Sequence, residues 1–196
     1  MAIKSDAPTS PKLPRLHHIT LQTARLDAMI DWYVAVLGMR ATHRADFGAW
    51  LTNDEANHRV AIVTFPEVSE RRDPRTHTGL RHVAFEFELV DDLMATYERV
   101  RNAGIEPDYC IDHGPTISFY YADPDGNYVE LQVDTFQNWS DSAAFMAKDP
   151  AFHADPRGKD FDPVALHHAW AQGATLDELH GMAYAGGFAP TVAKSD

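Results

Sequence analysis

Three side chains of this sequence have the types and positions needed to bind one metal ion: His18, His82 and Glu130. The two histidines occupy the same place in similar segments, because residues 16–21 read Leu-His-His-Ile-Thr-Leu and residues 80–85 read Leu-Arg-His-Val-Ala-Phe. Two imidazoles and one carboxylate hold one face of a divalent metal ion and leave the opposite face open for substrate and dioxygen. The sequence therefore predicts a metalloenzyme.

The similar segments indicate an internal repeat that would position these ligands. We predict a flexible N-terminal arm over residues 1–14 and a helical C-terminal extension over residues 135–196. Between them, residues 15–134 are predicted to form one domain made of two repeats, 15–66 and 80–134. Residues 67–79 between the repeats are charged, contain Pro74 and have no periodicity, which predicts a loop.

Each repeat has the pattern of a strand, a helix and further strands. Apolar residues at helical spacing predict helices over 28–37 and 91–102, each ended by a glycine, Gly38 or Gly104. The predicted strands are 18–23, 47–51, 59–65, 82–89, 117–121 and 128–133. Residues 123–126, Asp-Pro-Asp-Gly, predict a turn before the last strand.

Side-chain alternation places the candidate ligands on one face of the sheet. Residues i and i+2 of a strand share a face, so His18, His82 and Glu130 lie opposite apolar neighbours that should pack on the helices. The three ligands are then expected to converge on the concave side of a curved sheet. His17 falls on the other face and is expected to have a structural role.

Composition limits the classes of function. The formal net charge of −12 argues against nucleic-acid binding, and no apolar run approaches the roughly 18 residues of a membrane-spanning helix. The single cysteine, Cys110, excludes an intrachain disulfide and fits a reducing compartment. With no apolar secretory signal at the N-terminus, we expect a cytoplasmic protein without membrane or nucleic-acid partners.

The residues resemble a known family. A histidine opens each repeat, residues 32–38 read Trp-Tyr-Val-Ala-Val-Leu-Gly, and residues 123–130 read Asp-Pro-Asp-Gly-Asn-Tyr-Val-Glu. Together these motifs resemble the vicinal oxygen chelate superfamily, which includes glyoxalases, bleomycin-resistance proteins and dioxygenases. The resemblance covers about residues 15–134. It implies an α+β fold in which paired βαβββ units form a cup-shaped mixed sheet around one metal site, followed here by the helical extension.

Within that superfamily, the number of protein ligands points to dioxygenases. A glyoxalase-like site would have a fourth ligand in the first repeat at the place matching Glu130, and alignment of the terminal strands puts Ile62 at or beside that place. Three open metal positions would suit a catecholate bound through two oxygens plus dioxygen. The expected metal is Fe(II), with Mn(II) as the alternative.

Three further residues are similar to those of single-domain type I extradiol dioxygenases of the 2,3-dihydroxybiphenyl-cleaving type. His58 resembles the base that takes a proton from the catechol, since a neutral imidazole has a pKa close to ambient pH. Tyr120 and His113 resemble residues that hydrogen-bond a substrate hydroxyl or its oxyanion. The resemblance implies a catechol and O2 as substrates, and a homo-oligomer.

Other functions remain open from the sequence. A metal-dependent epimerase, isomerase or thiol transferase could use the three ligands without His58 and Tyr120. A non-catalytic small-molecule binding protein would usually lack the ligands.

In the C-terminal extension, Ser140 is the predicted N-cap of a helix. Five aromatic residues of the extension are expected to pack on the cup or on a second subunit: Trp139, Phe145, Phe152, Phe161 and Trp170. Four histidines of the extension are expected at surface or packing positions: His153, His167, His168 and His180.

Overall fold

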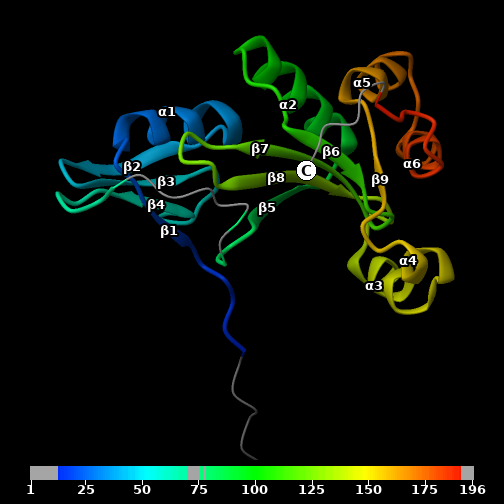
Figure 1. Ribbon diagram of the computed structural model, residues 1–196, viewed down its shortest axis with the longest axis horizontal. Coiled ribbons are helices and arrows are strands. Elements are labelled where there is room, and N and C mark those ends of the chain that lie inside the picture. The colour runs from blue at the N-terminus through cyan, green and yellow to red at the C-terminus, as the bar shows by residue number, and fades with distance from the viewer. Residues whose placement is uncertain (1–12, 70–75, 77, 191–196) are drawn as a thin grey trace, which may run out of the picture.

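The computed structural model describes residues 13–69, 76 and 78–190; most of the predicted N-terminal arm and part of the 67–79 loop lie outside these ranges. Two sheets lie side by side with a helix of each repeat on the same side of them, and short helices follow beyond the second sheet (Figure 1). The first repeat contains β1 (Ile19–Gln22), α1 (Leu26–Leu37), β2 (Arg40–Ala45), β3 (Gly48–Thr52) and β4 (Val60–Val63). The second contains β5 (His82–Phe87), α2 (Val90–Asn102), β6 (Tyr109–Asp112), β7 (Thr116–Ala122) and β8 (Tyr128–Asp134).

The strand order repeats as well. The sheets run β1-β4-β3-β2 and β5-β8-β7-β6-β9, with β1 parallel to β4, β5 parallel to β8 and the other pairs antiparallel. These two βαβββ units confirm the predicted α+β fold. Strands β2 and β6 were not predicted: β2 is almost wholly exposed and so lacks apolar alternation, and β6 is only four residues long.

The helices form as their apolar spacing predicts. Helix α1 ends at Gly38, whose φ of 61° is the left-handed conformation that glycine adopts without a Cβ clash. Its inner face buries Met29, Tyr33 and Val36, each at most 1% exposed. Helix α2 buries Leu93, Met94, Tyr97 and Val100 in the same core. Both helices therefore cover one side of the sheets and leave the other side free for a site.

Polar contacts fix the two repeats against each other. The Arg99 guanidinium on α2 donates to the carbonyl oxygens of Ala35 and Val36 at the end of α1. The Tyr33 hydroxyl donates to Asp123 in the turn before β8, at 3.3 Å. From the residue before α1, Arg25 donates to the carbonyl oxygen of Pro124 in that turn, at 2.8 Å. The predicted Asp-Pro-Asp-Gly turn is thus also a contact between the repeats.

The C-terminal extension contains α3 (Trp139–Lys148), α4 (Pro150–Ala154), β9 (Lys159–Asp160), α5 (Pro163–Ala171) and α6 (Leu176–Tyr184). The N-cap of α3 is Asn138, not the predicted Ser140, because the Asn138 side chain accepts from the Asp141 backbone N–H at 2.9 Å. Strand β9 pairs with β6, and Phe161 beside it is buried against Phe119. Where the domain ends and the extension begins stays a prediction, since the extension adds a strand to the sheet.

No helix in the described part of the chain is both long and apolar enough to cross a membrane.

Candidate metal and substrate site

Glu130 is the centre of a hydrogen-bonded group on the second sheet. It lies on β8, paired in register with Ala84 of β5 and Tyr120 of β7, and is only 4% exposed. One carboxylate oxygen, Oε2, is 3.0 Å from Nε2 of His82, and the other, Oε1, accepts from the Tyr120 hydroxyl at 2.8 Å. A buried carboxylate beside an imidazole nitrogen is a donor set that suits a divalent metal ion.

The surroundings keep the Glu130 carboxylate ionised. Burial by itself raises the pKa of a carboxyl group, but hydrogen bonds from His82, Ser118 and Tyr120 outweigh that effect and lower the pKa of Glu130 below its usual value. A metal ligand must be deprotonated. Glu130 is therefore in the charge state of a ligand at neutral pH.

His113 extends this group by one residue. Its Nδ1 lies 2.6 Å from the carbonyl oxygen of Arg157 and its Nε2 lies 2.8 Å from the Tyr120 hydroxyl. A carbonyl oxygen can only accept, so Nδ1 carries the ring proton. The single hydrogen of the Tyr120 hydroxyl then has two acceptors within reach, Glu130 Oε1 and Nε2 of the neutral His113 ring. Burial lowers the pKa of His113 and raises that of Tyr120, which keeps both groups uncharged near pH 7. The structure thus brings His82, Glu130, Tyr120 and His113 into one connected group.

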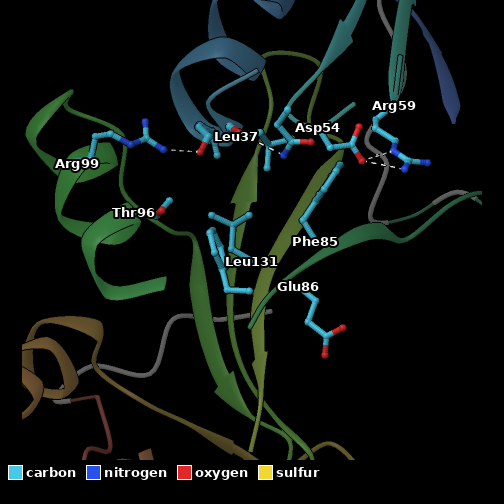
Figure 2. Close-up of a pocket in the computed structure, with 11 residues that line it drawn as sticks. Leu37, Asp54, Arg59, Phe85, Glu86, Thr96, Arg99 and Leu131 are labelled. Atoms are coloured by element: carbon cyan, nitrogen blue, oxygen red, sulfur yellow. Dashed lines mark hydrogen bonds and ion pairs between the residues drawn. The ribbon is translucent and has the colours of Figure 1, made fainter. Parts of the chain in front are cut away.

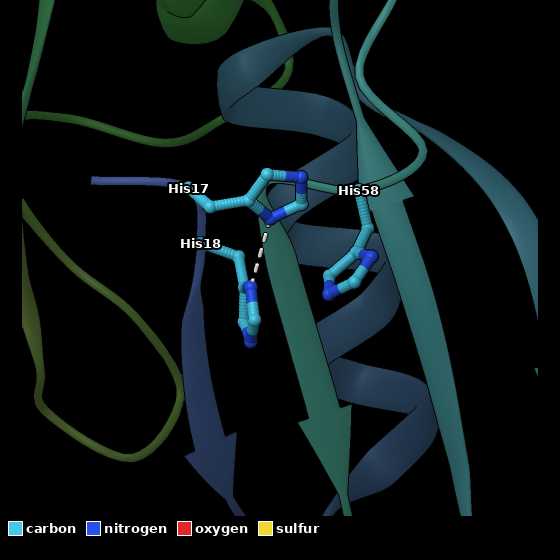
Figure 3. A group of neighbouring side chains, drawn as sticks. All are labelled: His17, His18 and His58. Carbon is cyan, nitrogen blue, oxygen red and sulfur yellow. Dashed lines mark hydrogen bonds between the residues drawn. The ribbon is translucent and has the colours of Figure 1, made fainter. Parts of the chain in front are cut away.

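The first repeat carries a second group of histidines. His17, His18 and His58 offer ring nitrogens that lie within 4.8 Å of one another, close enough to hold one metal ion (Figure 3). The His18 and His58 ring centroids are 4.3 Å apart, and Nδ1 of His17 is 2.9 Å from Nδ1 of His18. Desolvation, followed by the nearby His18 and His17, lowers the pKa of His58, which favours the neutral base.

The structural role expected for His17 followed from strand alternation, which does not apply here. Strand β1 begins only at Ile19, so His17 and His18 precede it and can turn toward each other. His17 joins the histidine group as a result, and sequence reasoning missed it.

The two groups lie apart within one copy of the chain. The described contacts of the His18 ring are with His17 and His58, not with His82 or Glu130. Two of the three predicted ligands, His82 and Glu130, are in contact. His18 is not with them, and the three-ligand set stays a prediction.

The residues that line two cavities between the repeats indicate how the repeats are oriented. One cavity, of about 310 Å³, is lined by Asp54 and Arg59 of the first repeat and by Phe85 and Glu86 of β5 (Figure 2). Arg59 lies near His18, because its carbonyl oxygen accepts from the backbone N–H of the next residue, Ile19. A second cavity, of about 270 Å³, joins residues 20–24 to Leu80 and Asn127, next to His82. Strands β1 and β5 therefore run in opposite directions, and His18 lies level with the far end of β5.

The strand register confirms that Ile62 lies beside the place matching Glu130. Thr20 pairs with Ala61 in the first sheet as its counterpart Ala84 pairs with Glu130 in the second. The position equivalent to Glu130 is therefore Ala61, and Ile62 is the residue beside it. The four residues of β4 are apolar on both faces, which left their register undefined by sequence. Neither Ala61 nor Ile62 has a side chain that can bind a metal, so the first repeat still offers no fourth carboxylate ligand at this place.

Sequence reasoning also missed Tyr109. Its ring stacks on Tyr120 with centroids 4.4 Å apart and an interplanar angle of 18°. Tyr109 pairs with Tyr120 in the β6–β7 register. Because β6 was not recognised as a strand, nothing in the sequence placed Tyr109 in the site.

Known proteins show the same combination of fold and sequence. Residues 15–131 match the family model described as Glyoxalase/Bleomycin resistance protein/Dioxygenase superfamily. The chain is 40% identical to "Biphenyl-2,3-diol 1,2-dioxygenase 2" and 42% identical to "Biphenyl-2,3-diol 1,2-dioxygenase 3" of Rhodococcus globerulus, in each case over 88% of this chain and 90% of the relative. It is 32% identical to "Lactoylglutathione lyase" of Neisseria meningitidis, over 60% of this chain and 88% of that protein.

One solved structure has the same fold. The glyoxylase/bleomycin resistance protein/dioxygenase domain from Frankia sp. EAN1pec superposes with a TM-score of 0.52 and 20% identity, covering 63% of this chain and 93% of that one.

Proposed function

The chain belongs to the Glyoxalase/Bleomycin resistance protein/Dioxygenase superfamily, and on that premise we propose that it is an extradiol dioxygenase that opens the ring of a catechol such as 2,3-dihydroxybiphenyl with O2. The observation that carries this proposal is the connected group His82–Glu130–Tyr120–His113. It combines two proposed metal ligands with two uncharged groups that could hydrogen-bond a substrate oxygen. Two relatives named as biphenyl-2,3-diol dioxygenases support the choice.

We propose that His18, His82 and Glu130 hold the metal, with Fe(II) as the expected ion and Mn(II) as the alternative. The donor set of two imidazoles and a carboxylate fits such an ion and leaves positions open for substrate. When bound, the metal supplies the Lewis-acid and redox chemistry by which a catecholate reacts with O2, and both oxygen atoms enter the product.

The protein side chains supply proton transfer and positioning. His58, kept neutral by its surroundings, accepts a proton on a ring nitrogen from one catechol hydroxyl, so that the substrate binds as an anion. Tyr120 stays protonated, and its hydroxyl is the group that hydrogen-bonds a substrate oxygen. His113, with Nε2 2.8 Å from that hydroxyl, lies beside the same substrate oxygen. Tyr109 stacks against Tyr120 and limits its movement.

The same fold also supports metal-dependent isomerases, and the relatives include lactoylglutathione lyases. Ala61 at the position equivalent to Glu130 removes the fourth carboxylate that such a site would use. This residue favours the dioxygenase over the isomerase.

Purified protein loaded anaerobically with Fe(II) is expected to convert 2,3-dihydroxybiphenyl in air to a yellow ring-fission product, with one O2 consumed per catechol. Absorbance and oxygen uptake measure the reaction, and the metal-free protein is the control. If no catechol yields product while the hemithioacetal of methylglyoxal and glutathione is isomerised, the isomerase function replaces this one.

We further propose a homodimer or larger assembly, because the large apolar side chain of Trp139 in the extension is 75% exposed. Light scattering at several dilutions is expected to report at least twice 21.9 kDa. A monomer that persists at all concentrations would contradict the assembly. The cytoplasmic location expected from the sequence stays a prediction.

A further inference from the structure

We infer that the C-terminal extension positions His113: it holds the 113–115 loop between β6 and β7 so that the His113 ring presents an unprotonated Nε2 to the substrate, and His180 of α6 is a positioning residue for it. The inference rests on the proposed function for the role of His113 beside a substrate oxygen. It goes further in giving a task to residues 157–184, which follow the last strand of the second repeat.

The first support is a backbone carbonyl of the extension that bonds the His113 ring. The carbonyl oxygen of Arg157 lies 2.6 Å from Nδ1 of His113. Strand β9, which begins two residues later, pairs with β6 through Lys159 and Asp112, so this carbonyl is held beside the ring. Because the ring proton is then on Nδ1, Nε2 is left as an acceptor, 2.8 Å from the Tyr120 hydroxyl.

The second support is the close approach of Gly158 to the same loop. Gly158 has a φ of 85°, which glycine adopts without strain. A Cβ at this position would overlap the carbonyl oxygen of Asp112 and lie 2.7 Å from Cα of His113. The segment that carries the Arg157 carbonyl therefore packs directly on the His113 backbone, and a larger residue at 158 would push the two apart.

The third support is a buried carboxylate that ties the loop to α6. Asp112, the residue before His113, is 0% exposed. Its Oδ1 accepts from the backbone N–H of Gly114 at 2.8 Å, and its Oδ2 lies 2.9 Å from Nδ1 of His180. A carboxylate can only accept, so His180 donates. Since a buried carboxylate is costly unless it is hydrogen-bonded, His180 fixes Asp112 and, through it, the turn that carries His113.

Apolar packing of the extension closes the remaining side of the loop. A Cβ on Gly114 would lie 2.8 Å from the Phe145 ring of α3 and 3.3 Å from the Tyr184 ring of α6. The Tyr184 ring also stacks on His180, with centroids 5.5 Å apart. Contacts from α3, the segment before β9 and α6 thus converge on the His113 ring and on the residues at either side of it.

Gly158→Ala tests the carbonyl contact. In metal-free protein, at a pH where the ring is neutral, nitrogen NMR is expected to show the His113 proton on Nδ1 in wild type and a loss of that tautomer in the variant. The His113 signals are identified by their absence from His113→Ala protein. With Fe(II) bound, kcat for 2,3-dihydroxybiphenyl is expected to fall by roughly 10- to 100-fold, the cost of a small displacement in a reacting site, while the Fe(II) content stays unchanged.

Gly173→Ala is the matched control for backbone strain. Gly173 also lies in the extension and has a φ of 93°, but no described atom lies within 4 Å of a Cβ built there. The two substitutions therefore introduce a similar strained conformation, and only the one at Gly158 presses on His113. Gly173→Ala is expected to keep the wild-type tautomer and kcat.

Two substitutions of His180 test the contact with Asp112. His180→Ala removes the donor and is expected to lower kcat. His180→Asn is expected to restore most of kcat, because the asparagine amide nitrogen lies near the place of Nδ1 and can donate to Asp112. In a His113→Ala background, His180→Ala is expected to lower kcat no further, since its effect passes through His113, whereas a purely stabilising residue would lower kcat in both backgrounds.

The outcomes separate this inference from the proposed function. A His113 proton on Nε2 in wild type, or a tautomer and kcat that stay unchanged in Gly158→Ala and His180→Ala, overturns the positioning role. If Gly158→Ala does not fold, the His180 variants decide it by the same measurements. A tautomer that changes in these variants while no catechol is cleaved by wild type supports the positioning of His113 and rejects the dioxygenase activity.

Discussion

Glu130→Ala protein is expected to lose tight metal binding and ring cleavage together. Glu130 is the carboxylate of the proposed ligand set, is 4% exposed, and is kept ionised by His82, Ser118 and Tyr120. Loss of a residue that only supports a metal ligand typically costs 10- to 100-fold in affinity or activity, so removal of a ligand itself should cost more. The measurement is metal content after dialysis, together with turnover of 2,3-dihydroxybiphenyl.

A surface carboxylate provides the comparison for that experiment. Glu98 lies on α2, in the helical layer and not on the sheet that carries the proposed ligands. Its side chain is 58% exposed, and its carboxylate is 4.0 Å from Nε2 of His167. Glu98→Ala protein is expected to keep its metal and its activity. Unchanged metal content in Glu130→Ala would contradict the ligand set and point to the His17, His18 and His58 group as the metal site instead.

His58→Gln protein is expected to keep its metal and bind catechol, yet turn over about 10²- to 10⁴-fold more slowly, the usual contribution of a general acid or base. Glutamine retains a polar side chain but cannot accept the catechol proton. Stopped-flow kinetics with 2,3-dihydroxybiphenyl separate binding from turnover. The exposed His168 on α5 provides the matched control, since His168→Gln should behave as wild type.

The pH profile gives this prediction a second readout. The pKa of His58 is lowered, so its imidazole is neutral at pH 7 and becomes protonated only in more acidic solution. Wild-type turnover should therefore fall as the pH drops through that pKa, because a protonated ring cannot accept the substrate proton. His58→Gln should lack this acidic limb and recover part of its activity at higher pH, where catechol ionises unaided. Near wild-type turnover at pH 7 would leave His58 with a structural role.

Much of the fold is determined locally and is visible in the sequence. The helix ending at Gly38 follows from apolar spacing and from a glycine that adopts positive φ. The turn at Asp123 follows from its side chain, which accepts from the backbone N–H groups of Asp125 and Asn127. Alternation also placed Glu130 opposite the buried Val129 and Leu131, on the face that carries the site.

Other features depend on contacts between elements that are distant in sequence. Strand β2 exists because β3 offers it a hydrogen-bonded edge, although its own side chains are exposed. Tyr109 reaches the site only through the pairing of β6 with β7. Ala61, rather than Ile62, occupies the place of Glu130 because strand register is set by the partner strand when both faces are apolar.

The separation of His18 from His82 is the clearest case of a feature that only the tertiary structure decides. The internal repeat places both histidines at equivalent points, and sequence reasoning took equivalence to mean that they converge within one chain. The contacts of Arg99, Tyr33 and Arg25 instead align the repeats in opposite directions. Local periodicity specifies which face of a strand a residue occupies, but the docking of two sheets depends on side chains that meet only after both have folded.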